Sequence, residues 1–223
     1  MKKITLKNVR VRFKEHVALD IPALEIGSRV KLAVMGESGS GKSTLLNILC
    51  ALEEINCGMI FWNNTRIDTL NQMQKDKFRY DKVGLVMQDF YLYSGLSALQ
   101  NVLLPVKFHY LKIPKPLVFR AVDLLKRLNI TQYSKNIDTM SRGEKQRVAI
   151  ARALINSPQV IIADEPTASL DTQNSLHVTK LLLSLADEMG SALICATHDN
   201  ILSNHLTHHL WLEKDKKIEA FFA

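Results

Sequence analysis

A chain of 223 residues, 47% of them hydrophobic and 23% charged, fits one α/β domain, or one domain with a modest insertion, and is long enough to bury a core. This composition excludes a disordered or fibrous protein. The net charge of +7 is compatible with nucleic acid or anionic head groups as partners. Because the charges alternate with apolar residues along a strand, however, we interpret them as a solvated face.

The cysteines and the apolar runs both bear on the compartment. Cys50, Cys57 and Cys195 are an odd number without Cys-x-x-Cys spacing, which argues against a disulfide scaffold and a zinc knuckle and favours a reducing cytosol. No apolar stretch approaches the length of a membrane span, and residues 1–5 lead into an alternating strand rather than a signal-type segment. We therefore expect any membrane role to come through a partner.

The first predicted element is a half-buried strand over residues 9–13, in which apolar residues alternate with arginines. Residues 17–21 are predicted to return as its hairpin partner, and Pro22 is expected to close the unit. Phe13 continues the apolar face that begins at Val9, so burial in the core is one expectation for its side chain.

The next apolar run, residues 30–35, leads into a stretch that fits the phosphate-binding pattern Gly-x4-Gly-Lys-Ser/Thr. The stretch consists of Gly36, Glu37, Ser38, Gly39, Ser40, Gly41, Lys42, Ser43 and Thr44. Glycines let backbone N–H groups surround a polyphosphate, and the helix that begins near Ser43 adds its positive dipole end. Lys42 supplies a charge for the β- and γ-phosphates, and the Ser43 hydroxyl suits Mg²⁺. This order of strand, loop and helix predicts a nucleoside triphosphate site.

Two more strands and several helices are predicted before residue 158. Residues 58–62 have the pattern of a strand ended by an Asn-Asn turn, and a charged helix is expected over residues 70–80. The apolar run 83–87 is the second strand, and it ends at Gln88. From there to about Asn136, prolines and helical periodicity indicate an all-helical insertion between two strands of the sheet.

A capping box opens the next helix, with Ser141 as the cap and Glu144 three residues later. The helix is expected to end before Pro158. A strand that begins at Val160 then delivers two adjacent carboxylates, Asp164 and Glu165, at its end.

A helix from Thr172, stopped near Gly190, and a strand over residues 192–197 that ends at His198 complete the pattern. Alternating strands and helices imply an α/β fold with a mostly parallel sheet, in which functional residues gather at the carboxyl ends of the strands. We expect the phosphate loop, Gln88, the two carboxylates and His198 to meet there.

A second group of polar residues has the spacing of metal ligands. His205, His208 and His209 follow the i, i+3, i+4 pattern of one helical face. Because residues 210–212 look like a strand that begins at once, the three would not share such a face. We expect no metal site there.

Hydrolysis of a phosphoanhydride needs a phosphate cradle, a metal, an oriented water and stabilisation of charge at the γ-phosphoryl group. Asp164 suits a Mg²⁺ ligand beside Ser43, and Glu165 suits a general base or a water-positioning residue. The alternative, in which the two carboxylates only cap the next helix, is weakened by Pro166 and by the upstream phosphate loop.

In this order the motifs resemble those of the nucleotide-binding subunit of ATP-binding cassette (ABC) transporters, over nearly the whole chain. The resemblance implies one P-loop NTPase domain over residues 1–223, with an antiparallel β subdomain on its N-terminal side and a helical subdomain at about 89–157. It implies that Gln88 contacts Mg²⁺ and relays to a membrane partner, and that His198 is the switch histidine. It also implies that Phe13 stacks on adenine. Two further motifs are implied: the signature that begins at Ser141, Arg142, Gly143 and Glu144, and the D-loop Ser169, Leu170 and Asp171.

The signature departs from the family's usual Leu-Ser-Gly-Gly-Gln/Glu, because Arg142 replaces the first glycine. In the family two subunits form a head-to-tail dimer, and the signature helix of one presents N–H groups to the γ-phosphate held by the other. Arg142 loses conformational freedom and adds bulk near that phosphate, or it contributes positive charge there. The substitution puts the rate of hydrolysis in question, but not ATP binding.

The function implied by the resemblance is a cytoplasmic ATPase that uses ATP and Mg²⁺, dimerises, and drives a separate integral membrane permease subunit. It would lie on the cytoplasmic face of the inner membrane, with no nucleic acid as partner. Residues 96–102 and the short chain resemble the branch of lipoprotein-release, macrolide-export and antimicrobial-peptide-resistance ATPases. Two alternatives stay open: a non-transport cassette ATPase acting on ribosomes or DNA, and a regulatory cassette that hydrolyses ATP poorly.

Overall fold

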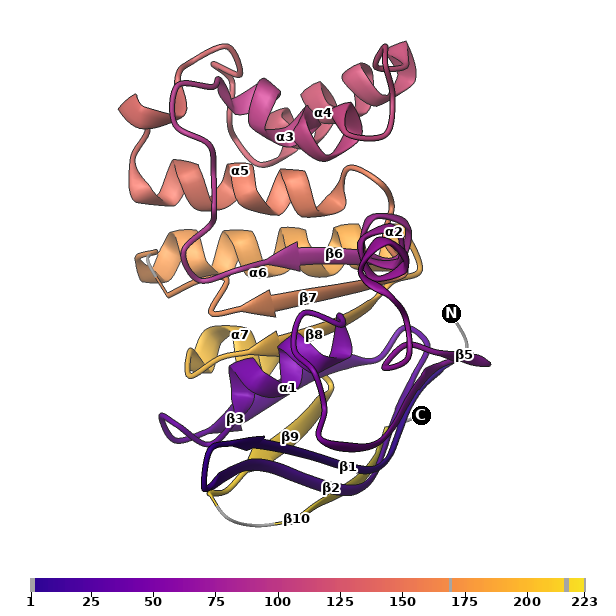
Figure 1. Cartoon of the computed structure of the whole chain (residues 1–223). Coiled ribbons are helices and arrows are strands. Elements are labelled where there is room, and N and C mark those ends of the chain that lie inside the picture. Colours follow the sequence, from indigo (N-terminus) through magenta and orange to yellow (C-terminus); the bar gives the residue numbers. More distant parts are fainter. Residues whose placement is uncertain (1–2, 169, 215–216, 223) are drawn as a thin grey trace.

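The computed structural model describes residues 3–168, 170–214 and 217–222. Its strands form two five-stranded sheets, and helices lie between the sheets and on the outer face of one of them (Figure 1). The D-loop residue Ser169 lies outside the described residues. Among the residues that are described, no helix has both the length and the apolar character needed to cross a membrane.

The first sheet is built from parallel strands in the order β6-β7-β8-β3-β9. Its strands are β3 (Lys31–Gly36), β6 (Val83–Val86), β7 (Val160–Asp164), β8 (Ala192–Ala196) and β9 (His208–Leu212). All five strands therefore end at the same edge of this sheet, as the alternation of strands and helices predicted.

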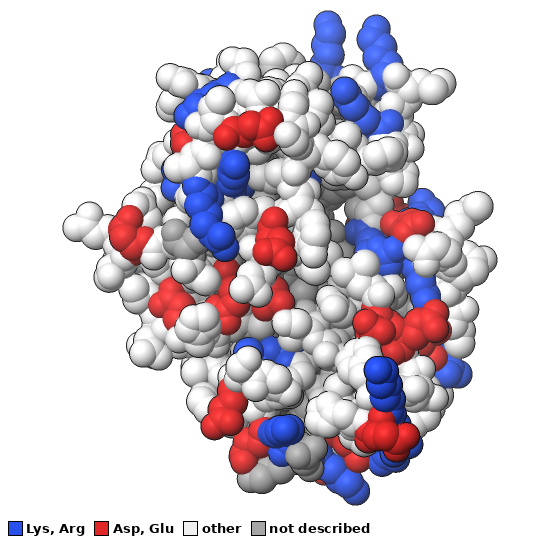
Figure 2. Space-filling model, turned by 60° about the vertical axis from the view of Figure 1, so that its left-hand side comes forward, with Lys and Arg blue, Asp and Glu red and all other residues white. Residues whose placement is uncertain are grey.

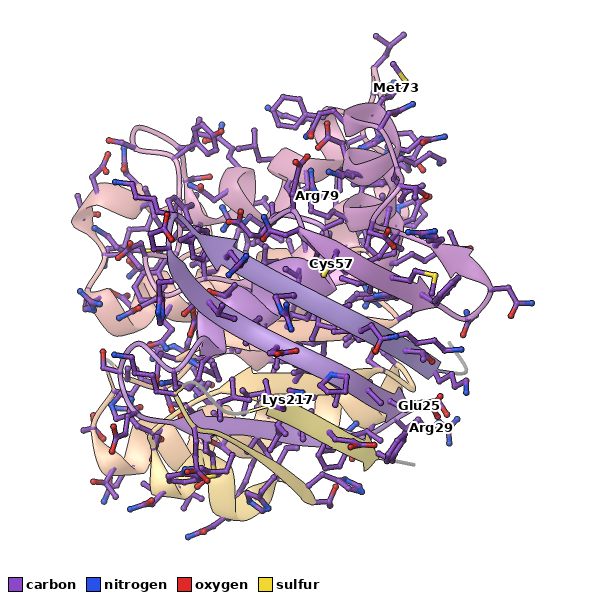
Figure 3. All side chains as sticks on the ribbon, turned by 60° about the horizontal axis from the view of Figure 1, so that its bottom comes forward. Glu25, Arg29, Cys57, Met73, Arg79 and Lys217 are labelled. Carbon is purple, nitrogen blue, oxygen red and sulfur yellow. The ribbon has the colours of Figure 1, made fainter. Side chains whose placement is uncertain are left out.

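The second sheet has the order β10-β2-β1-β4-β5 and is antiparallel except for β10, which runs parallel to β2. Its strands are β1 (Lys3–Phe13), β2 (His16–Gly27), β4 (Cys57–Trp62), β5 (Thr65–Arg66) and β10 (Lys217–Phe222). Figure 3 views this sheet from below, with Lys217 on β10 and Cys57 at the start of β4.

The hairpin of β1 and β2 is longer than the sequence predicted, because β2 continues through Pro22 to Gly27. Pro22 lies opposite Asn8, at a break in the ladder between the pairs Lys7↔Ala23 and Val9↔Ile21. Asn8 has a positive φ of 49°, so the two backbones are not paired at this point and the missing N–H of proline costs no ladder hydrogen bond.

The helices lie on two sides of the parallel sheet. They are α1 (Lys42–Leu49), α2 (Gln72–Lys82), α3 (Ala98–Lys107), α4 (Lys115–Arg127), the 3₁₀ turn η1 (Ile137–Thr139), α5 (Arg142–Leu154), α6 (Thr172–Glu188) and α7 (Asn200–His205). The helices α3, α4 and α5 all fall between β6 and β7 in the chain and form the upper layers in Figure 1.

Alternate residues of the parallel strands face two separate cores. Leu32, Ile162 and Ile194 pack with α1 and the antiparallel sheet. Ile161 and Leu193 face the other way, toward α5 and α6. A sheet covered on both faces needs strands that are apolar throughout, which is why β7 and β8 have continuous apolar runs.

The three cysteines are free. Cys50 and Cys195 are buried, and burial raises the pKa of the Cys50 thiol to about 12 and raises that of Cys195 as well. Both therefore behave as core residues rather than as nucleophiles or metal ligands.

Candidate nucleotide site

The phosphate loop joins the end of β3 to the start of α1, as the strand-loop-helix pattern predicted. Gly36 and Gly41 have φ values of 143° and 95°, which side chains rarely allow. A Cβ at Gly36 would lie 2.2 Å from the carbonyl oxygen of Leu212, and one at Gly41 would lie 2.7 Å from that of Ala18. The loop can be built in this tight form only because both positions are glycine.

The amino end of α1 is left open to a ligand. No side chain caps α1, whereas α2, α3, α5, α6 and α7 all have Asn, Ser or Asp caps. Lys42 Nζ lies across the loop and donates to the carbonyl oxygens of Gly36 and Glu37, each at 2.8 Å. Uncapped N–H groups, the helix dipole and a lysine at one point form an anion site.

One pocket of about 670 Å³ brings together most of the predicted site residues. It is lined by Phe13, His16, Ala18, Gly36, Glu37, Ser38, Gly39, Gly41, Lys42, Ser43, Thr44, Gln88, Asp164, Glu165 and His198. These residues come from the carboxyl ends of β3, β6, β7 and β8 and from the β1–β2 hairpin. Of these lining residues, the sequence predicted all except His16 and Ala18.

Glu165 and His198 form a direct contact in this pocket. His198 Nδ1 lies 2.7 Å from Glu165 Oε1, and the Thr197 hydroxyl lies 3.5 Å from Glu165 Oε2. The Glu165 side chain is 10% exposed and the His198 side chain 76% exposed. Glu165 has a φ of 51°, a left-handed conformation that is costly for a glutamate and typical of residues held in place by a functional site.

Asp199 supports this pair from behind, and no pattern in the sequence pointed to it. Its carboxylate accepts hydrogen bonds of 2.6 Å from the hydroxyls of Thr167 and Ser175 and caps α7 through the N–H of Ile201 at 2.8 Å. Although burial acts to raise it, the pKa of Asp199 is lowered, because these donors favour the ionised form. Asp199 therefore fixes the backbone next to His198 to the segment after Glu165.

Gln146 is a second residue that sequence reasoning missed. It is fully buried on α5, and its side-chain amide donates to the carbonyl oxygen of Pro166. A glutamine among the apolar positions of an otherwise amphipathic helix was the signal that could have identified it. This bond ties the signature helix to the segment that follows Glu165.

The capping box at the start of α5 is confirmed. The Ser141 hydroxyl accepts from the N–H of Glu144 at 3.2 Å, and Glu144 Oε2 accepts from the N–H of Ser141 at 2.7 Å. The N–H of Ser141 is the main cause that lowers the pKa of Glu144, with a further contribution from Lys135, whose Nζ lies 3.4 Å from the carboxylate.

The signature residues do not line the pocket of their own chain. Ser141, Arg142, Gly143 and Glu144 are absent from its walls, as is Asp171, which caps α6 by accepting from the N–H groups of Gln173 and Asn174. These N–H groups and the Asn174 side chain lower the pKa of Asp171. The structure therefore places the predicted nucleotide contacts in two separate groups.

Arg142, the residue that departs from the usual signature, lies over the ring of Phe90, with its guanidinium carbon 5.5 Å from the ring centre. Phe90 is 8% exposed, and Arg152 donates to the carbonyl oxygens of Phe90 and Tyr91. The Arg142 side chain is thus held against the segment that follows Gln88.

Phe13 is not a core residue, so that expectation from the strand pattern was wrong. Its side chain is 47% exposed and lines the pocket. The register of β1 shifts between Val11 and Arg12, which turns Phe13 away from the buried face of Val11. The three histidines with metal-ligand spacing lie in two different elements, His205 at the end of α7 and His208 and His209 in β9.

A phosphate loop between β3 and α1, with a carboxylate at the end of β7 and both in one pocket of a parallel sheet, defines a P-loop nucleoside triphosphatase. The model of the ABC transporter family matches residues 19–168. The chain belongs to this family and is an ATP-binding subunit with ATPase activity.

The relatives and solved structures that the chain resembles agree with this family assignment. The chain is 36% identical to the lipoprotein-releasing system ATP-binding protein LolD of Treponema pallidum, over 94% of this chain and 90% of that protein. It is 34% identical to the uncharacterised ABC transporter ATP-binding protein MJ0796 of Methanocaldococcus jannaschii, covering 98% of both. A dimeric structure of MJ0796 superposes with a TM-score of 0.89 and 36% identity over 97% of each chain. A second, in a post-hydrolysis state with ADP and Pi, has a TM-score of 0.88 with 35% identity and the same coverage.

Proposed function

We propose that this chain is the ATPase subunit of a transporter of the lipoprotein-releasing type, and that it works as a dimer on a separate integral membrane permease. Relatives from several organisms that are named as lipoprotein-releasing system ATP-binding proteins support the branch. On this proposal the chain is one cassette domain that lies on the cytoplasmic face of the inner membrane. Convergence of the phosphate loop, Glu165 and His198 in one pocket carries the proposal.

ATP would enter with its phosphates in the loop and at the open end of α1, where Lys42 meets the β- and γ-phosphates. Phe13, half exposed at the rim, would stack on the adenine ring. Glu165 would orient the attacking water and accept its proton, and His198 would hold the Glu165 carboxylate and approach the γ-phosphate.

The residues present fit Mg²⁺. A serine hydroxyl, an amide oxygen and a carboxylate, from Ser43, Gln88 and Asp164, share the pocket, and hard oxygen ligands are what this ion prefers. When bound, the ion neutralises charge on the β- and γ-phosphates. Only one member of this set, Asp164, is a carboxylate. A group of three His, Cys, Asp or Glu side chains that could hold a metal ion is not found among the described residues.

A second cassette would complete each site. Since Ser141, Arg142 and Gly143 lie outside the pocket of their own chain, they are available to the nucleotide held by a partner. Arg142 is anchored on Phe90, so we propose that its charge reaches the edge of the partner's site rather than filling the place of the missing glycine. The dimeric form reported for MJ0796 supports this arrangement.

The permease would bind in a groove beside the nucleotide pocket. This groove, of about 800 Å³, lies between α2, β6, α3 and the last turn of α5. Its walls include Leu52, Leu85, Tyr91 and Phe108, with Arg79 and Asp76 as charged members. Met87 lines the groove and the next residue, Gln88, lines the nucleotide pocket, so one turn of chain touches both sites. A segment that presses on the groove would therefore contact the residue next to Gln88.

Lys42→Ala tests the nucleotide assignment. Loss of a lysine that contacts phosphate should weaken ATP binding by about 10- to 100-fold, measured by calorimetry on the purified chain. Lys7→Ala, an exposed lysine on β1, is the matched control and should bind as the unaltered chain does. Undiminished binding by Lys42→Ala would refute the assignment of the loop.

Purification of tagged Glu165→Gln protein with ATP from gently solubilised membranes tests the partner. We expect a stoichiometric multi-span membrane protein to accompany it. Recovery of ribosomes or nucleic acid without such a protein would replace this proposal by a non-transport ATPase.

A further inference from the structure

The segment from Phe90 to Val122 contains no aspartate or glutamate, although it contains three lysines and one arginine. Arg120 points inward and donates to the carbonyl oxygens of Leu154 and Ile155. The three lysines, Lys107, Lys112 and Lys115, are exposed. The segment therefore carries positive charge and has no carboxylate of its own; Asp123, directly after it, interacts with Arg120.

The same segment exposes large apolar side chains. Leu111 is fully exposed, at 112% of its reference area, and Phe108, Phe119 and Tyr110 are 77%, 73% and 44% exposed. We call residues 107–119 the basic-aromatic loop: the last residue of α3, the connection to α4 and the first turn of α4. Four exposed apolar side chains within thirteen residues are more than the scattered single ones that a protein surface normally shows.

The loop is anchored at both sides of its tip. The His109 ring stacks on the ring of Tyr80 from α2, with centroids 3.4 Å apart and planes at 24°. The N–H groups of His109 and Tyr110 both donate to the carbonyl oxygen of Val106 at 3.1 Å, and Ile113 packs against the core. Leu111 therefore projects from a loop whose flanking residues are fixed by these contacts.

This loop lies at one end of the molecule. In Figure 1 the connection between α3 and α4 is at the top, farthest from β10 and the antiparallel sheet. Figure 2 shows Lys and Arg side chains standing out from this same end. A flat surface approaching that end would meet the tip of the loop first.

We propose that the basic-aromatic loop binds the surface of an anionic lipid bilayer. Tyr110, Leu111 and Phe119 would enter the head-group boundary, where aromatic and leucine side chains partition favourably, while Lys112 and Lys115 meet lipid phosphates. Lysines that flank apolar side chains can extend their charge to the head groups while their stems cover apolar surface. A bilayer matches both the missing carboxylates and the protruding leucine.

The lipid contact goes beyond the transport function and does not require the permease. Phe108 and His109 line both the permease groove and a smaller hollow of about 410 Å³ inside the loop, so the two surfaces are continuous. When a membrane protein occupies the groove, the basic-aromatic loop would therefore contact the lipid next to that protein.

The test is sedimentation of the purified chain with vesicles, either neutral phosphatidylcholine or a mixture with 30% phosphatidylglycerol. We expect binding to the anionic vesicles that weakens with salt. Lys112→Gln with Lys115→Gln should reduce partitioning on the order of 20-fold, about fivefold for each charge. Tyr110→Ser with Leu111→Ser should reduce it by a similar factor through lost apolar burial.

Matched substitutions at the opposite end provide the control. Lys217→Gln with Phe221→Ser removes one lysine and one 63% exposed phenylalanine from β10 and should leave vesicle binding unchanged. Lys217 is labelled in Figure 3. All variants should keep the thermal midpoint and ATP affinity of the unaltered chain, because none contacts the core or the pocket.

A tryptophan at the tip reports insertion directly. Leu111→Trp should show a blue-shifted emission with anionic vesicles and not with neutral ones. Absence of binding by the unaltered chain, equal binding to both vesicles, or binding that the loop variants do not change would overturn the proposal. The Lys42→Ala and copurification results would still decide the transport function separately.

Discussion

At the scale of single residues, Glu165 is the side chain on which the proposed chemistry depends. It is largely buried, is held in a left-handed conformation and contacts His198 at 2.7 Å. A general base contributes about 10²- to 10⁴-fold to a rate. We predict that Glu165→Gln lowers kcat by at least about 100-fold and changes ATP affinity by less than about twofold, measured by phosphate release and by calorimetry. Hydrolysis at the parental rate would show that another group activates the water.

The hydrogen bonds of Asp199 lead to a prediction about the stability of the fold. Its ionised form accepts from Thr167, Ser175 and the N–H of Ile201, and hydrogen bonds to a charged group contribute about 1.5–3 kcal/mol. We predict that Asp199→Ala lowers the free energy of unfolding in urea by about 2–3 kcal/mol at pH 7. Glu15→Ala, an exposed carboxylate in the β1–β2 turn, should change it by less than about 0.5 kcal/mol.

The pH dependence of this difference follows from the lowered pKa of Asp199. The folded state favours the carboxylate, so its stabilisation is complete above the ordinary value of 3.8 and is lost as the pH falls through the lower folded-state value. The gap between the parental chain and Asp199→Ala should therefore be constant from pH 7 to about pH 5 and shrink below pH 4. A gap that grows on acidification would contradict the assigned hydrogen bonds.

At the scale of elements, α3 and α5 offer a matched pair of capping boxes. Ser97 and Gln100 on α3 have nearly the same geometry as Ser141 and Glu144 on α5. We predict that Ser97→Ala and Ser141→Ala each cost about 1 kcal/mol of stability. Only Ser141→Ala should also lower ATPase activity of the dimer, because only that cap belongs to the signature. Equal loss of activity in both would reduce the role of Ser141 to helix stability.

Local patterns predicted most elements, because each depends on neighbours in the chain. The strand, loop and helix around Lys42 and the capping box at Ser141 were predictable for this reason. The register shift that exposes Phe13 was not, since it depends on how β1 pairs with β2. Nor was the addition of β10 beside β2, a contact between residues about 200 positions apart.

The residues that line the candidate site were predictable, but the residues that hold them in place through hydrogen bonds were not. Parallel strands must end at one edge, so Gln88, Asp164, Glu165 and His198 had to meet the loop. Asp199 and Gln146 act through hydrogen bonds to segments distant in sequence. No local pattern marks Asp199, and the apolar neighbours of Gln146 on α5 predict its burial but not its bond to Pro166. The contact of Arg142 with Phe90 likewise depends on tertiary packing.

At the scale of the whole molecule, the groove and the nucleotide pocket meet at Met87 and Gln88. We predict that Leu52→Glu, which places a charge among the apolar side chains of the groove, abolishes copurification of the proposed permease and leaves ATP binding by the isolated chain unchanged. Met73→Glu is the matched control, since Met73 is 82% exposed, lies outside the groove and projects from α2 in Figure 3. Loss of the partner from both variants, or from neither, would remove the groove as its binding site.

The proposed function depends most on one arrangement, in which the signature of one chain completes the ATP site of another. The direct measurement is the mass of the Glu165→Gln protein by light scattering, with and without ATP. We predict one chain without nucleotide, twice that mass at saturating ATP, and a single chain again when Ser141→Ala and Arg142→Ala are added. Protein that binds ATP and stays monomeric would show that the signature does not complete the ATP site of a second chain.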